Sequence, residues 1–181
     1  MNKIVILCGS PQEKSKIEVV LRHIQAILES EGFSITFLSV LDFSPVNLIK
    51  GYYNSIEIKK FTEVMEEADG VLIGSPVYKA SYTGALKSLI DLLPEGALKG
   101  TPVFPLMVGG TGAHLLAIEY ALKPLINSLK GKPTHGIYIL DSQIDRMSKD
   151  NPIIDVEIIN RLYVQLNDFV RSIQIKNPFI A

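Results

Sequence analysis

The chain of 181 residues has one cysteine, no tryptophan and a formal net charge of −1. Its single cysteine, Cys8, excludes an intrachain disulfide and is typical of a protein of the reducing cytoplasm. The near-neutral charge, without a dense run of Lys or Arg, argues against nucleic-acid binding. The apolar runs are too short for a transmembrane helix. We therefore expect one cytoplasmic globular domain over residues 1–181, without nucleic-acid or membrane partners.

Recognisable catalytic and metal-binding patterns are also absent from the sequence. The three histidines are dispersed, and none belongs to a pattern such as His-Glu-x-x-His. His114 alone would suit acid–base chemistry, but no Ser, Cys or Asp partner stands at a recognisable spacing. We predict no catalytic protein residue and no metal site. The chemistry would then come from a bound cofactor.

Apolar runs and amphipathic segments alternate along the chain. The runs are continuous rather than alternating with polar residues, which indicates strands covered on both faces. The strand-like segments are 4–8, 34–40, 70–74, 103–108 and 136–140. The helix-like segments are 16–31, 55–68, 83–93, 113–129 and 155–175.

This alternation predicts an α/β fold with a five-stranded parallel sheet and helices on both faces. Three of the strands are followed by loops suited to ligand binding, namely the first, third and fourth. The strand order 2-1-3-4-5 is favoured because its switch point lies between the first and third strands, where such folds bind ligands.

The loop after the first strand begins Gly9-Ser10-Pro11 and leads through Ser15 into a helix at Lys16. Hydroxyl groups, a lysine and a helix N-terminus together suit a phosphate group. Neither a Gly-x-Gly-x-x-Gly motif nor a nucleotide-triphosphate P-loop is present. A simple turn with a helix cap explains this loop equally well.

The loop after the third strand reads Pro76-Val77-Tyr78-Lys79. Proline stiffens the turn, and Val77 and Tyr78 offer packing surface for a flat aromatic ligand. Lys79 would lie near negative charge on such a ligand. Taken singly, Tyr78 is explained as well by an ordinary half-buried tyrosine.

The loop after the fourth strand carries three glycines within four positions, from Gly109 to Gly112. Gly109 and Gly110 allow the backbone to approach a ligand closely, and Thr111 can donate to it or cap the next helix. A flexible turn with a cap is the simpler alternative. Three such loops at one sheet edge favour a shared ligand site.

Together these motifs resemble the flavodoxin-like NADPH-dependent FMN reductases, over the region from the first strand to about Gln143. The resemblance extends in particular to the FMN reductases of two-component alkanesulfonate monooxygenase systems. The residues that carry it are Gly9–Pro11, Ser15, Ser75–Lys79, Gly84–Lys87, Gly109–Thr111, Ala113–Pro124 and Asp141–Gln143.

The resemblance implies hydride transfer from NADPH to FMN, with reduced FMN supplied to a partner monooxygenase, and a homodimer or homotetramer. It places the FMN phosphate at the first loop and the flavin ring between Pro76–Lys79 and Gly109–Thr111. A reductase that retains FMN and reduces quinones or azo compounds is one alternative. A flavodoxin-type electron carrier is another, although such carriers are usually strongly acidic, unlike this chain.

Two positions bear on how firmly FMN is held. The resemblance assigns Tyr120 to a π-helical insertion at a tetramer interface, a feature associated with flavin release; an ordinary core or interface aromatic residue is the alternative. Gln12 stands where the family commonly has arginine, which removes a bidentate phosphate donor. Lys14 or Lys16 could replace its charge. We expect FMN to bind loosely and to exchange as a substrate.

Overall fold

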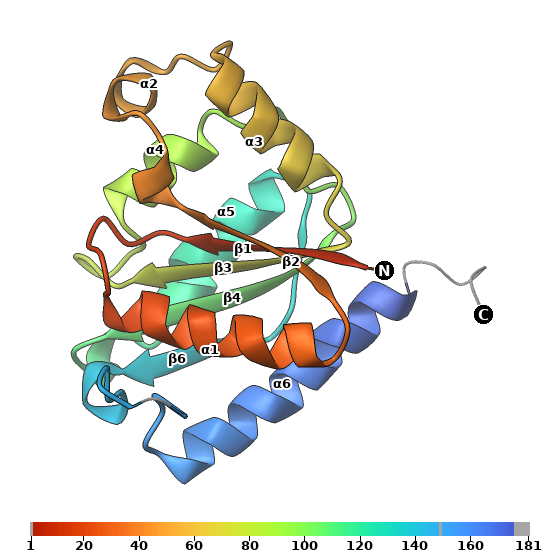
Figure 1. Ribbon diagram of the computed structural model, residues 1–181. Helices are drawn as coiled ribbons and strands as arrows, with labels where there is room; N and C mark the ends of the chain where they lie inside the picture. Colours follow the sequence, from red (N-terminus) through yellow and green to blue (C-terminus); the bar gives the residue numbers. More distant parts are fainter. Residues whose placement is uncertain (1, 149, 176–181) are drawn as a thin grey trace.

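The computed structural model of the protein describes residues 2–148 and 150–175 (Figure 1). Its centre is a parallel sheet in the order β2-β1-β3-β4-β5, with β6 also paired to β4. The predicted fold class and strand order are therefore confirmed. The strands are β1 Lys3–Cys8, β2 Ser34–Ser39, β3 Gly70–Pro76, β4 Pro102–Gly109, β5 Lys132–Pro133 and β6 Ile137–Leu140.

The predicted number of five strands is wrong, because two short strands pair with β4 on the same side. β5 pairs with the start of β4 and β6 with its end. Pro105 lies in β4 between the residues that pair with β5 and those that pair with β6, and it has no N–H for the ladder. Gly136 passes so close that a Cβ there would lie 2.4 Å from the Pro105 carbonyl oxygen. A two-residue Lys-Pro strand carries no hydrophobic pattern from which it could be predicted.

Helices cover both faces of the sheet, as expected. Figure 1 shows α1 and α6 on one face and α3, α4 and α5 on the other. Within residues 2–148 and 150–175, no helix is long and apolar enough to cross a membrane. The helices are α1 Lys16–Ser30, α2 Pro45–Lys50, α3 Ile56–Glu66, α4 Gly84–Ile90, α5 Lys123–Ser128 and α6 Val156–Ile175.

The core consists of two layers, one on each side of the sheet. Successive side chains of β3 alternate between them: Val71 and Ile73 pack towards α3, α4 and α5, and Leu72 towards α1 and α6. Six of the seven residues of β3 and all eight of β4 are buried. This explains why the central strands are continuous apolar runs in the sequence.

The short helix α2 was not predicted. It begins at Pro45, whose fixed φ suits the first turn of a helix, and ends at Gly51 in the left-handed conformation. None of its residues is buried. Leu48 is only partly buried against the core, and Val46 and Ile49 are exposed. Six residues are too few to show a helical hydrophobic period in the sequence.

The segment 113–129 does not form the continuous α-helix that was predicted. It consists of a 3₁₀ turn, η2 (Gly112–His114), a π-helix, η3 (Ile118–Leu122), and then α5. The Lys123 N–H donates to the Ile118 carbonyl, five residues earlier. In a regular α-helix the ring of Pro124 would collide with the carbonyl four positions before it, at Tyr120. The wider π-turn around Tyr120 avoids this collision, and the expected π-helical insertion is present.

Phe169 tests the packing of α6 on the sheet. Its ring is fully buried and meets Phe104 of β4 edge to face, with 5.9 Å between ring centroids. Phe169→Ala should lower the free energy of unfolding by about 3–5 kcal/mol, because the truncated ring leaves a cavity. Urea denaturation measures the loss. The control is Val164→Ala on the exposed face of α6, with an expected change within about 0.5 kcal/mol. Equal losses in the two variants would contradict this packing.

Candidate functional site

A cleft of about 260 Å³ lies at the carboxyl edge of the sheet. Its walls come from the loops after β1, β3 and β6 and from the end of β4. Ligands of doubly wound folds bind at this edge, beside the β1/β3 switch point. The residues that line the cleft are Ser10, Gln12, Ser15, Lys16, Ile17, Pro76, Tyr78, Val108, Asp141 and Arg146.

The first loop turns tightly against its neighbours. The Gly9 N–H donates to the Gly74 carbonyl over 2.7 Å. A Cβ at Gly9 would lie 2.9 Å from the Leu86 side chain and 3.1 Å from the Gly74 oxygen, so only glycine fits without a shift. Ser10 is buried, and its Oγ bonds both the N–H and the carbonyl of Gln12 at 3.1 Å. The loop is therefore held in shape before any ligand binds.

The N-terminus of α1 opens onto this cleft. Ser15 is the N-cap and accepts a hydrogen bond from the Glu18 N–H. The N–H groups of Lys16 and Ile17 belong to the first turn, where no intrahelical acceptor exists. The Lys16 Nζ donates to the backbone carbonyl of Asp141 across the cleft. Unpaired N–H groups and a lysine ammonium together suit a phosphate.

Thr83 joins the first loop to the second. Its Oγ1 donates to the Gly9 carbonyl over 2.5 Å and accepts from the Leu86 N–H, at the start of α4. Its own N–H donates to Ser75 Oγ, which in turn donates to the Pro76 carbonyl. Thr83 and Ser75 are both buried. Two loops far apart in sequence thus form one wall.

The second loop is a two-residue turn between Tyr78 and Ser81. The backbone groups of these two residues exchange hydrogen bonds of 2.9 and 3.1 Å. Lys79 and Ala80 both have positive φ, 51° and 62°. For residues other than glycine this conformation costs about 1–2 kcal/mol each. The strained turn holds Tyr78, 42% exposed, beside Pro76 in the cleft wall.

The third loop borders the same edge but does not line the cleft. Gly109 passes close to Tyr138, and a Cβ there would lie 2.0 Å from the Tyr138 hydroxyl oxygen. That hydroxyl donates to the Thr111 carbonyl over 2.6 Å. Gly110 and Thr111 are exposed, and Thr111 caps η2.

The predicted site residues therefore fall into two groups. Those in the cleft wall are Ser10, Ser15, Lys16, Pro76 and Tyr78. Those on the same loops but outside the wall are Pro11, Val77, Lys79, Gly109, Gly110 and Thr111.

Asp141 and Arg146 also line the cleft and were not predicted as site residues, although Asp141 is part of the Asp141–Gln143 stretch that carries the family resemblance. Both follow β6, the last strand of the sheet. The rule that ligands bind beyond the carboxyl ends of parallel strands already pointed to this loop. It contains neither glycines nor an aromatic residue that would draw attention in sequence.

Cys8 and His114 are two potentially reactive side chains beside the predicted loops. Cys8 is buried directly before the first loop, and burial raises the pKa of its thiol to about 11. It is thus a neutral core residue at physiological pH. His114 is exposed on η2. In the part of the chain that the structure describes, no three His, Cys, Asp or Glu residues are grouped as metal ligands.

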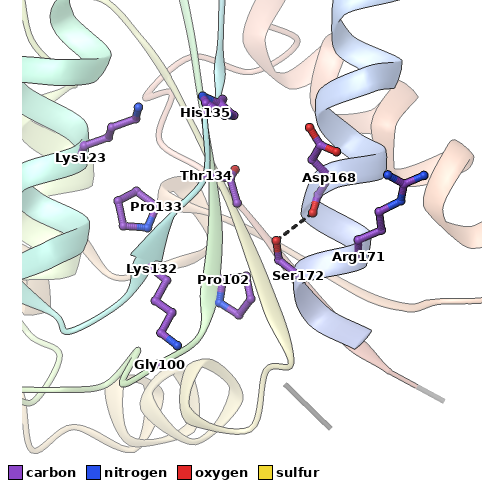
Figure 2. Close-up of a pocket in the computed structure, with 10 residues that line it drawn as sticks. All are labelled: Gly100, Pro102, Lys123, Lys132, Pro133, Thr134, His135, Asp168, Arg171 and Ser172. Atoms are coloured by element: carbon purple, nitrogen blue, oxygen red, sulfur yellow. Dashed lines mark hydrogen bonds between the residues drawn. The ribbon is translucent and has the colours of Figure 1, made fainter. Parts of the chain in front are cut away.

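A larger cavity, of about 760 Å³, lies at the opposite end of β4 (Figure 2). It opens between the start of β4 and α6, near Pro102. None of the predicted site residues lines it. Its lining residues are Gly100, Pro102, Lys123, Lys132, Pro133, Thr134, His135, Asp168, Arg171 and Ser172.

The fold is flavodoxin-like, and its cleft lies at the β1/β3 edge, where such folds bind ligands. The chain belongs to the NADPH-dependent FMN reductase family, whose model matches residues 2–145. It is an NADPH-dependent oxidoreductase that acts on FMN.

Known relatives agree with this assignment. An FMN reductase (NADPH) of Escherichia coli K12 is 42% identical over 143 residues, 78% of this chain and 75% of the relative. One of Pseudomonas putida KT2440 is 35% identical over 173 residues, 95% and 86% of the two chains. The crystal structure of apo NADH:FMN oxidoreductase (EMOB) superposes with a TM-score of 0.84 at 28% identity, covering 95% of this chain and 90% of that one.

The residues of the cleft fit FMN. The first turn of α1 and the cations of the cleft would suit the charge of its phosphate, and Pro76, Tyr78 and Val108 would offer apolar surface to its ring. When bound, FMN supplies the hydride acceptor. The chain's own contribution would be to bind and orient the two partners of the reaction.

A substitution of Thr83 tests whether its hydrogen bonds between the loops after β1 and β3 contribute to stability and FMN binding. Thr83→Val removes the hydroxyl but keeps the shape, and leaves the Gly9 carbonyl and the Leu86 N–H without this partner. We expect a loss of about 1–3 kcal/mol in the free energy of unfolding and weaker FMN binding. Chemical denaturation and FMN titration measure the two effects. Thr83→Ser keeps both hydrogen bonds and should behave like the wild type. If serine were as damaging as valine, the hydroxyl would not be the cause.

Proposed function

We propose that this reductase binds FMN as an exchangeable substrate and delivers reduced FMN to a separate FMN-dependent monooxygenase in the cytoplasm. The observation that carries this proposal is the π-helix Ile118–Leu122 with Tyr120 at its centre. A π-turn inside a helix is frequently a functional irregularity. A sulfonate is the substrate class that the sequence resemblance suggests for the monooxygenase.

The surface around the π-helix supports assembly of the reductase with itself. Tyr120 is 79% exposed, so its ring is not part of the core of the chain. Leu115 and Leu116, one turn earlier, are each at least half exposed. Neighbouring exposed apolar side chains are typical of an interface. A homodimer or homotetramer would cover them.

For FMN itself we propose the placement given by the three loops. Ser10, Pro11, Ser15 and Lys16 would hold the phosphate at the start of α1. The ring would lie against the second and third loops. The residues proposed to border the ring are Pro76, Val77, Tyr78, Lys79, Gly109, Gly110 and Thr111.

The main alternative is a reductase that keeps FMN and passes electrons to a quinone or an azo compound. Steady-state NADPH oxidation separates the two. Saturable dependence on added free FMN supports the exchanged substrate. Full activity without added flavin, seen only when a quinone is present, would overturn it. A parallel series with NADH measures the preference between the two nicotinamides.

Tyr120 links the π-helix to flavin exchange. We expect Tyr120→Ala to copurify with more FMN and to turn over free FMN several-fold more slowly, because the exposed ring is proposed to hold the interface at which flavin is released. The FMN absorbance of the purified protein and NADPH oxidation with free FMN are the measurements. Tyr163→Ala, an exposed tyrosine on α6, is the matched control. If the two variants were alike in flavin content and turnover, Tyr120 would have no special role.

A further inference from the structure

We propose that Arg146 is a specificity residue that binds the phosphate of FMN and distinguishes FMN from flavins without phosphate. It lines the same cleft as Lys16 and Ser15 at the start of α1. It also lies one residue beyond the part of the chain that the family model matches. The inference rests on the proposed placement of FMN.

The backbone around Arg146 is well anchored although the residue itself is exposed. Ile144 forms an antiparallel bridge with Ile153, and both side chains are buried. The Asp145 N–H donates to the Pro152 carbonyl over 2.8 Å. A side chain that starts from a fixed backbone loses less conformational freedom on binding than one on a loose loop.

The side chain of Arg146 has hydrogen-bond donors to offer a ligand in the cleft. Among residues 2–148 and 150–175, no hydrogen bond or ion pair involves its guanidinium. The neighbouring Asp145 carboxylate instead accepts from the Met147 N–H over 2.9 Å. Lys16, the other cation of the cleft, already donates to the Asp141 carbonyl. Arg146 thus brings a planar set of donors that can bind two phosphate oxygens at once.

The charged side chains that line the cleft favour binding of an anion. Lys16 and Arg146 are positive, Asp141 is negative, and Gln12 contributes only a neutral amide. A phosphate monoester carries close to two negative charges at neutral pH. Without Arg146, Lys16 and the helix N-terminus would face this charge together with the Asp141 carboxylate. The guanidinium therefore makes the cleft net positive.

Two phosphate monoesters meet this enzyme, the 5′-phosphate of FMN and the 2′-phosphate of NADPH. We assign Arg146 to FMN, because the same cleft contains Ser10, Ser15 and the first turn of α1. Riboflavin and NADH are the matching ligands without these phosphates. They allow the two assignments to be separated.

The test compares dissociation constants for FMN and riboflavin, measured by quenching of flavin fluorescence on the flavin-free protein. We expect the wild type to prefer FMN. Arg146→Ala should weaken FMN binding about tenfold, the lower range for a charged hydrogen bond, and leave riboflavin binding unchanged. Arg146→Lys should lie between them, because it keeps the charge and loses the planar donors. The control, Arg171→Ala at the distant cavity, removes the same charge and should not alter the preference.

A second variant tests whether a guanidinium supplied from another position of the cleft can replace that of Arg146. Gln12 lines the same cleft, so Gln12→Arg in the Arg146→Ala background offers a guanidinium from the opposite loop. Recovery of the preference for FMN over riboflavin is the expected result. Recovery without any change in riboflavin binding identifies the phosphate as the group recognised.

Several results would overturn the assignment. One is an equal loss of FMN and riboflavin affinity in Arg146→Ala, which would indicate a role in ring binding or loop structure. Another is unchanged binding of both flavins. A third is a lost preference for NADPH over NADH with the flavin preference intact, which would assign Arg146 to the other phosphate. The binding constants are independent of turnover, so failure here would leave the exchanged-FMN proposal to its own steady-state test.

Discussion

A buried hydrogen bond of 2.5 Å between Thr83 and the Gly9 carbonyl is the contact on which the geometry of the site depends. It spans the β1/β3 switch point and links the loop after β1 to the loop after β3. The two bonded residues are more than 70 positions apart in the sequence. The parallel sheet brings their ends together, and the hydroxyl fixes their separation. The same side chain caps α4, so the helix, both loops and the cleft wall share one anchoring group. The strained Lys79–Ala80 turn can then be tolerated, because its surroundings are held by other bonds.

Most of the sheet could be predicted because strands that are buried on both faces are continuous apolar runs in the sequence. The runs at 70–74 and 103–108 are buried almost throughout and correspond to β3 and β4. The elements that were missed have no such apolar run. β5 has two residues and pairs with the start of β4, and α2 has no fully buried side chain. The interruption between β5 and β6 arises from the fit of Gly136 against Pro105, a contact between distant segments that no local pattern contains.

Some residues of the candidate site could likewise be predicted from the sequence, and others could not. Glycines, a helix start and an aromatic turn made the loops after β1 and β3 recognisable, and the structure places both in one cleft. Asp141 and Arg146 reach that cleft through the folding of the segment after β6. Asp141 belongs to the Asp141–Gln143 stretch of the family resemblance, but no local pattern assigned either residue to the site. The π-helix was expected from resemblance alone. Its physical cause, the ring of Pro124 four positions after Tyr120, is nevertheless readable in the sequence once the helix has been placed.

The burial of Cys8 has a consequence for the durability of the enzyme. Reduced flavin that meets oxygen produces hydrogen peroxide, and peroxide oxidises thiolates far faster than thiols. The one cysteine of the chain lies immediately before the loop that faces the cleft, 1% exposed and with a thiol pKa near 11. It therefore stays protonated and out of contact with solvent at the pH of a cell. A catalyst whose product generates an oxidant thus keeps its most oxidisable side chain in an unreactive form.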